Sequence, residues 1–230
     1  MGSKQLTSCT ISSRHCACFE QLTNAEQKRV EENTAIVKYK KGELICKQGA
    51  MASQILYIES GLAKVFLDNG NDTLVLKVIP PGNLLGLTSI GSENSTFQYS
   101  ALAYVDSVVK QIEISCFKEM LHTNPKFASE VIEILISNTV QINGRFFCLT
   151  HKQSYGRLAD ILLCLADRIF YSQDFLLPLS RKELAELSGI SAETVVRMLK
   201  KVNDEGLIAT EGKNLRILDY HKLKIISEMG

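Results

Sequence analysis

Short hydrophobic runs separated by turn-forming residues fill residues 34–115. The clearest runs, several of which alternate apolar with polar positions, are Ile55–Glu59, Ala63–Leu67, Thr73–Ile79 and Val105–Ile112. Strands that recur about every ten residues are typical of a β-barrel or jelly roll. A capping box at Thr23–Glu26 predicts a helix before this β-rich region.

The next pattern is helical. Asn124 as the cap and Pro125 at the first position predict a helix that runs to about Leu149. Positions spaced alternately by four and three residues form one face of it: Val131, Leu135, Asn138, Ile142, Arg145 and Leu149. This face fits a two-helix coiled coil, with Asn138 as the polar residue that fixes its register. The alternative is that this face packs on the chain's own barrel, but a second apolar face is available for that role: Ile132, Ile136 and Val140.

Residues 180–201 predict two short helices joined by a tight turn. Ser180 and Glu183 form a capping box, Gly189 ends the first helix, and Ser191 caps the second. The second helix directs an apolar side inward: Val195, Met198 and Leu199. Its outward face is Ala192, Glu193, Val196, Arg197 and Lys200. Such a face suits a DNA major groove, and a pair of packed surface helices is the alternative.

A β-hairpin is predicted after these helices. Gly206 ends the second helix, and the apolar runs 207–209 and 215–218 flank a turn at Glu211–Asn214. A helix-turn-helix followed by a hairpin is a winged helix. A further predicted helix, Gly156–Phe170, leads into it.

Composition places the chain among globular proteins, because 45% of its 230 residues are hydrophobic and its net charge is +1. It has no apolar run of about 18 residues, which predicts no membrane-spanning helix. Residues 1–18 lack a signal-peptide core, so we expect a cytoplasmic location. Residues 181–201 hold five Lys or Arg against three Glu, so DNA binding should depend on shape and base contacts more than on bulk charge.

Seven cysteines are scattered along the chain, and this odd number predicts reduced thiols. Cys9, Cys16 and Cys18 cluster near the N-terminus and could bind zinc or an iron–sulfur cluster, but we favour free thiols and no metal. No histidine lies between residues 16 and 121, which nearly excludes a metal-dependent jelly-roll enzyme. Neither a phosphate-cradling loop nor a nucleophile motif is present, so no enzymatic activity is expected.

The order of these elements resembles the Crp/Fnr family of bacterial transcription regulators. Lys41–Gly49, Leu56–Val65 and Pro81–Gly86 are similar to the family's β-roll, Gly156–Ala159 to the helix after its hinge, and Glu193–Arg197 to its recognition helix. The resemblance covers roughly residues 20–220.

The resemblance implies an α+β fold with an N-terminal jelly-roll domain of the cyclic-nucleotide-binding-like type, a long dimerisation helix and a C-terminal winged helix-turn-helix. The expected boundaries are an N-terminal tail at 1–19, a β-roll sensor domain at 20–123, the dimerisation helix at 124–151 and the DNA-binding domain at 152–230. It also implies a homodimer that binds two-fold symmetric double-stranded DNA and contacts RNA polymerase.

In the family, residues at the positions of Glu193 and Arg197 read base edges. Arginine suits guanine O6 and N7, and glutamate accepts from the cytosine amino group, whereas Ala192 and Val196 could contact thymine methyl groups. The other DNA-binding candidates are Ser191, Lys200, Arg181 and Lys213. The alternative for Glu193 and Arg197 is a surface ion pair.

The effector is left open. Cyclic-AMP-responsive relatives carry Gly-Glu-Leu and then Arg-Ser/Thr-Ala, but here Leu87 replaces the Glu, and no Arg or Lys lies between Lys77 and Lys110. Cyclic AMP in the usual mode is therefore not expected. The candidate effector pocket is Leu85, Gly86, Leu87, Thr88, Thr96, Gln98 and Asn143. One alternative is a redox or nitric-oxide sensor with haem or an iron–sulfur cluster, although Lys110 occupies the fourth-ligand position of oxygen-sensing relatives. Another alternative is a ligand-binding module that does not bind DNA.

Overall fold

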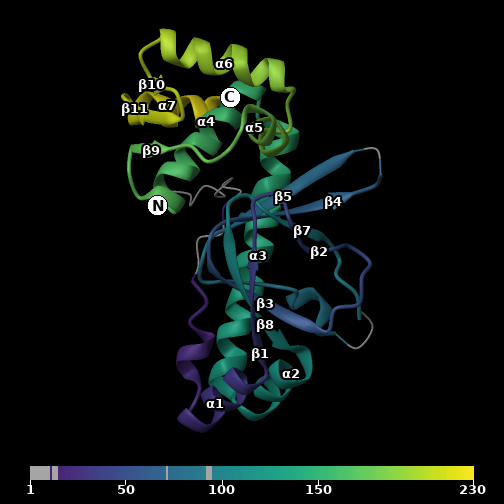
Figure 1. The fold of residues 1–230 in the computed structure, drawn as a ribbon. Helices are drawn as coiled ribbons and strands as arrows, with labels where there is room; N and C mark the ends of the chain where they lie inside the picture. Colours follow the sequence, from purple (N-terminus) through teal and green to yellow (C-terminus); the bar gives the residue numbers. More distant parts are fainter. Residues whose placement is uncertain (1–10, 12–14, 71, 92–94) are drawn as a thin grey trace. The chain divides into compact units, whose positions relative to one another are not determined.

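The computed structural model describes residues 11, 15–70, 72–91 and 95–230. The chain forms two compact units. One holds the described residues of Ser12–Asp72 and Val78–Thr139, and the other holds those of Met1–Ile11, Thr73–Lys77 and Val140–Gly230. Helix α3 (Pro125–His151) is continuous and contributes residues to both units (Figure 1). Within the described ranges, no helix is both long enough and apolar enough to cross a membrane.

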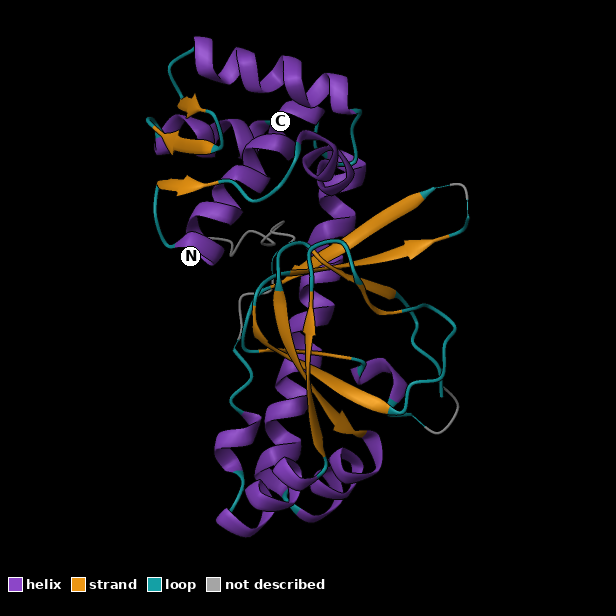
Figure 2. Cartoon of the chain, in the orientation of Figure 1, coloured by secondary structure: helices purple, strands orange, loops and turns teal. Residues whose placement is uncertain are grey.

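Two four-stranded sheets form the β-roll (Figure 2). The first has the order β1 (Thr34–Tyr39), β8 (Ser107–Glu113), β3 (Gln54–Ser60) and β6 (Asn83–Leu85). The second has the order β2 (Leu44–Cys46), β7 (Ser100–Ala103), β4 (Ala63–Asp68) and β5 (Thr73–Ile79). The four runs read from the alternation pattern correspond to β3, β4, β5 and β8, which confirms the predicted β-rich region.

Helices join the first sheet through an aromatic core. They are the short 3-10 turn η1 (Cys18–Gln21), α1 (Asn24–Glu32), α2 (Ile114–Thr123) and the start of α3. The predicted capping box is present, because the Thr23 hydroxyl accepts from the Glu26 amide and the Glu26 carboxylate accepts from the Thr23 amide at 2.8 Å. The ring of Phe127 on α3 lies 5.1 Å from Phe117 on α2 and 5.9 Å from Phe19 on η1, measured between centroids. Helix α2 was not predicted from the pattern.

The second unit carries the winged helix. It contains α4 (Ser154–Leu165), a π-helical turn η3 (Ala166–Phe170), β9 (Asp174–Leu176), α5 (Arg181–Ser188), α6 (Ala192–Asp204), β10 (Ile208–Glu211), β11 (Asn214–Ile217) and α7 (Tyr220–Met229). The predicted hairpin is confirmed, since Glu211 pairs with Asn214 across a two-residue turn. Strand β9, which adds a third strand beside β11, and helix α7 were missed.

Candidate functional site

Helices α5 and α6 form the predicted helix pair, and capping hydrogen bonds define their ends. The Ser180 hydroxyl accepts from the Glu183 amide at 3.2 Å, and the Glu183 carboxylate accepts from the Ser180 amide at 2.6 Å. Gly189 turns the chain with φ at +63°, a left-handed conformation that favours glycine. Ser191 then caps α6 by accepting from the Thr194 amide at 3.1 Å. Local sequence signals therefore determine where each helix starts and stops.

Helix α6 has one buried and one exposed side. Val195, Leu199 and Val202 are buried. The predicted outward residues Ala192, Glu193, Val196, Arg197 and Lys200 are all exposed, as is Ser191. Glu193 and Arg197 form no ion pair with any residue that the structure describes. The alternative of an ion pair between these two side chains is therefore not observed. Both side chains are available to a ligand.

A cluster of side chains holds the C-terminal half of α6 against α4. The Tyr155 hydroxyl donates to the Glu205 carboxylate at 2.9 Å, and the Lys201 ammonium lies 4.6 Å from the centre of the Tyr155 ring. Burial, together with the Glu205 carboxylate, raises the pKa of Tyr155 to about 12, so its hydroxyl remains a donor at neutral pH. Ser188, the residue before the turn glycine, is buried, and its hydroxyl donates to the Leu184 carbonyl at 2.6 Å. These contacts fix the position of α6 against α4 and leave its other side exposed.

Asp174 on β9 ties this strand to the wing hairpin of β10 and β11. Its carboxylate accepts from Arg216 at 2.7 Å and from Asn214 at 2.9 Å, both on β11. These hydrogen bonds lower the pKa of Asp174, so the contact persists across the neutral range. Lys213, at the tip of the hairpin, is exposed, whereas Arg181, at the start of α5, is half-buried. Three cationic elements therefore occupy this unit: the α5 start, α6 and the wing tip.

Two known families match successive parts of the chain. The cyclic nucleotide-binding domain matches residues 36–124, and the Crp-like helix-turn-helix domain matches residues 156–226. The chain belongs to the Crp/Fnr family of DNA-binding transcription regulators. Together the two matches cover more than half of it, in the order that the resemblance predicts. Regulators of this family bind DNA and act as dimers.

The sequences of known relatives align with most of the length of this Crp/Fnr regulator. Electron transport regulator A of Shewanella oneidensis is 25% identical over 95% of this chain and 91% of that protein. Transcriptional activator protein anr of Pseudomonas aeruginosa is 28% identical over 80% of this chain and 77% of that protein. The structure of FixK2 from Bradyrhizobium japonicum superposes on this chain with a TM-score of 0.77 and 19% sequence identity. The superposition covers 84% of this chain and 96% of the FixK2 chain, which shows that the two share a fold.

The predicted effector residues of the regulator lie partly together. Gly86, with φ at +89°, donates its amide to the Tyr99 hydroxyl at 2.8 Å, while Leu87 beside it is buried. Burial raises the pKa of Tyr99. The Gln98 side chain donates to the Thr96 carbonyl at 3.0 Å, and the Ser89 hydroxyl donates to the same carbonyl at 2.9 Å. Leu85 is buried in β6, Thr88 is exposed, and Asn143 lies exposed on the part of α3 that belongs to the other unit.

Buried cations are present outside residues 78–109, the stretch that lacks Arg and Lys. Lys77 on β5 and Arg145 on α3 are buried in one unit, and Arg145 donates to the Val75 carbonyl at 3.1 Å. Burial lowers the pKa of Lys77 to about 8. Lys64 on β4 is buried too, 5.7 Å from the centre of the Tyr104 ring. The only sequence signal for them was a charged residue inside a strand or helix with apolar neighbours.

The predicted dimer face of α3 is partly wrong. Val131 and Arg145 are buried within the chain's own fold, and so are Phe127, Ile134, Gln141 and Cys148. The residues assigned to the barrel, Ile132, Ile136 and Val140, are instead exposed. The error arose because both faces of α3 repeat with the same alternating spacing, and because a buried Arg145 requires a carbonyl partner that the pattern does not reveal. Leu135 and Ile142 are exposed as predicted, while Asn138 and Leu149 are half-buried.

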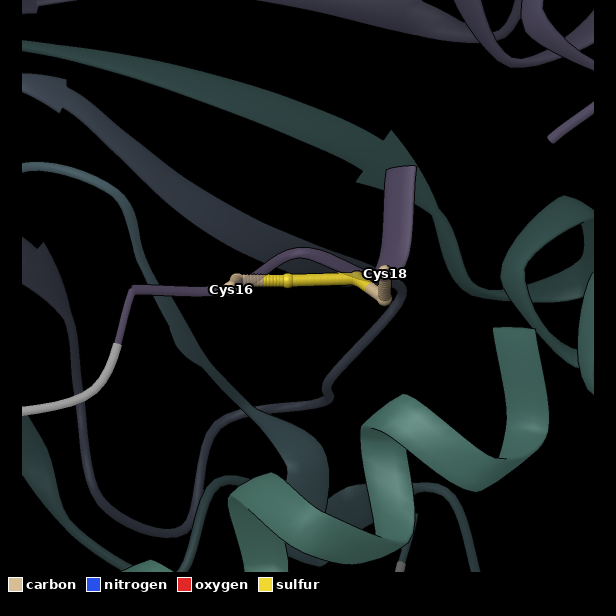
Figure 3. Close-up of a disulfide and its surroundings, with 2 residues drawn as sticks. All are labelled: Cys16 and Cys18. Carbon is tan, nitrogen blue, oxygen red and sulfur yellow. A yellow bond between two sulfur atoms is a disulfide. The ribbon is translucent and has the colours of Figure 1, made fainter. Parts of the chain in front are cut away.

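The N-terminal cysteines also depart from prediction. Cys16 and Cys18 form a disulfide, not a pair of free thiols (Figure 3). Their Cα atoms are 5.5 Å apart, within the usual range for a disulfide, so this local spacing outweighs the argument from number and scatter. Both residues pack in the apolar cluster that contains Leu87. Cys46, Cys116 and Cys148 are free and buried. Cys9 lies outside the described residues, among which no group of three or more His, Cys, Asp or Glu could hold a metal ion.

Proposed function

We propose that the protein is a homodimeric regulator whose two α6 helices enter the major groove at the two halves of a palindromic DNA site. The observation that carries this proposal is the exposed side of α6, where Glu193 and Arg197 lie one turn apart without an ion-pair partner among the described residues. Helices presented in this way read base edges through their N-terminal residues.

Each exposed residue has a role that fits its chemistry. Arg197 donates to guanine O6 and N7, and Glu193 accepts from the cytosine amino group. Ala192 and Val196 contact thymine methyl groups. The remaining candidates Ser191, Lys200, Arg181 and Lys213 contact phosphates, which adds affinity and little sequence preference. The expected half-site has a G·C pair in a T-rich context.

Selection from a random DNA library tests these roles. Arg197→Ala is expected to lose the preference for the G·C pair, with a cost of about 1–3 kcal/mol in specific binding. Arg29→Ala is the matched control, since it removes the same charge from the exposed helix α1 in the other unit. An unchanged selected sequence for Arg197→Ala would contradict the assignment of base reading to α6.

The dimer is proposed to form through the exposed row of α3, which consists of Ile132, Leu135, Thr139, Ile142 and Phe146. These positions alternate by three and four residues, which is the spacing of a two-helix coiled coil. Nearly half or more of each of Ile132, Ile142 and Phe146 is exposed in the single chain, at 56%, 48% and 68%. A second copy of the helix would cover this apolar row.

An effector other than cyclic AMP is proposed to control DNA binding. The Gly86 amide, which could bind an anion, already donates to Tyr99, and Leu87 supplies no hydrogen bond for a ribose. Calorimetry with cyclic AMP is expected to give no heat of tight binding at the β-roll, and a submicromolar site would contradict this. Anaerobic absorbance with metal analysis separates an organic effector from the haem or iron–sulfur alternative, because only the latter gives a coloured protein.

The remaining parts of the proposal follow from the family. We expect the dimer to contact RNA polymerase in the cytoplasm and to carry no catalytic activity of its own.

A further inference from the structure

A cavity of about 490 Å³ opens on the outer face of the first sheet of the β-roll. None of the predicted effector residues lines it. Ile36, Lys110 and Tyr57 stand opposite one another on β1, β8 and β3, so they form one row across its floor. Thr34 and Ile112 form the next row. Its size lies within the range of small-molecule sites, which is about 300–1,000 Å³.

Aromatic and aliphatic side chains dominate the walls. Phe19 on η1 meets Tyr57 edge to face, with 5.5 Å between ring centroids, and Val30 on α1 adds aliphatic surface. Ile36 is 62% exposed at the cavity, so apolar surface there remains uncovered. A flat, largely apolar molecule would cover Ile36 and stack against the two rings.

The two charged residues that line the cavity, Lys110 and Glu31, disfavour an anion. The Lys110 ammonium lies 2.7 Å from the Glu59 carboxylate, so its charge is already balanced. Glu31, which also lines the cavity, forms no ion pair within the described part of the chain. A bound anion would therefore meet one neutralised cation and a further carboxylate. The Tyr57 hydroxyl, which has no hydrogen-bond partner among the described residues, and the remaining N–H groups of Lys110 suit an uncharged oxygen acceptor.

We propose that this cavity is a ligand site for a neutral, flat, mainly apolar molecule with a hydrogen-bonding oxygen or nitrogen. The site is separate from the cassette around Gly86 and needs neither DNA nor a dimer to bind its ligand.

A matched pair of fluorescent probes tests the proposal on the full-length chain. N-phenyl-1-naphthylamine is neutral, and 8-anilinonaphthalene-1-sulfonate carries the same rings with one negative charge. The neutral probe should bind saturably and about tenfold more tightly than the sulfonate, because like charges repel at the Glu31 side of the cavity. Equal affinities at this site would overturn the charge argument.

Three variants locate the probe. Ile36→Trp fills the cavity mouth and should weaken the neutral probe about tenfold or more. Leu44→Trp is the control, because Leu44 is 45% exposed on β2 and does not line the cavity. Both positions are exposed, so circular dichroism should show an unchanged fold. Glu31→Gln should strengthen sulfonate binding several-fold and leave the neutral probe unchanged. The proposal fails if Ile36→Trp has no effect, if Leu44→Trp weakens binding equally, or if Glu31→Gln leaves sulfonate binding as it was.

Discussion

Lysine at Ile132 should dissociate the dimer without unfolding the chain. Ile132 is 56% exposed in the single chain, so about half of its surface remains to be buried by a partner helix. Because full burial of such a side chain contributes about 1.5–3 kcal/mol, the half that remains contributes about 1 kcal/mol per copy and about 2 kcal/mol per dimer. Loss of this amount raises the dissociation constant about 30-fold, before any repulsion between the two introduced ammonium groups.

Sedimentation equilibrium measures this dissociation constant. Ser115→Lys is the matched control, because it places the same charge on an exposed helical position of α2. Val131→Ala provides the contrast, since Val131 belongs to the buried face and its truncation should lower the free energy of unfolding by about 1–3 kcal/mol while the dimer persists. The assignment of the two faces is refuted if Ile132→Lys leaves the dissociation constant unchanged. It is also refuted if Val131→Ala dissociates the dimer while the free energy of unfolding stays the same.

Two further predictions concern the buried Lys77 and the half-buried Tyr155. Burial lowers the Lys77 pKa from 10.5 to about 8, so Lys77→Met should remove one pH-dependent contribution to the free energy of unfolding. Between these values the unfolded chain binds the extra proton, so wild-type stability rises relative to Lys77→Met as pH increases from 8 to 10.5; a pH-independent difference in urea midpoints would argue against this. Tyr155→Phe removes the hydrogen bond to Glu205 but keeps the ring beneath Lys201, and should cost about 1 kcal/mol in thermal unfolding, whereas an unchanged midpoint would indicate that the hydroxyl contributes nothing.

Local signals were sufficient for several helix ends and for four of the eight β-roll strands, namely β3, β4, β5 and β8. The capping boxes at Thr23 and Ser180, the cap at Asn124 and the left-handed Gly189 each act within a few residues, and each is present where the sequence predicts it. Helices α2 and α7 were missed because neither begins with a strong capping box, and β9 has only three residues.

Contacts between distant segments could not be read from the sequence. The buried face of α3 depends on the Val75 carbonyl, which receives the Arg145 guanidinium from 70 residues away in the chain. The cavity beside Lys110 likewise depends on the register that places Ile36, Lys110 and Tyr57 in one row across three strands. Periodicity identifies the faces of an element, but the partner that covers each face is a property of the whole fold.

The two faces of α3 impose a constraint on how a signal can use this helix. The inward row (127, 131, 134, 138, 141, 145 and 148) and the outward row (132, 135, 139, 142 and 146) are one residue out of phase. Successive residues of an α-helix point about 100° apart, so a rotation that brought the outward row against the chain's own fold would carry the inward row to a third direction, where neither surface covers it. The two faces therefore cannot be exchanged by turning the helix about its axis, and we expect a signal to leave α3 in its present rotational setting.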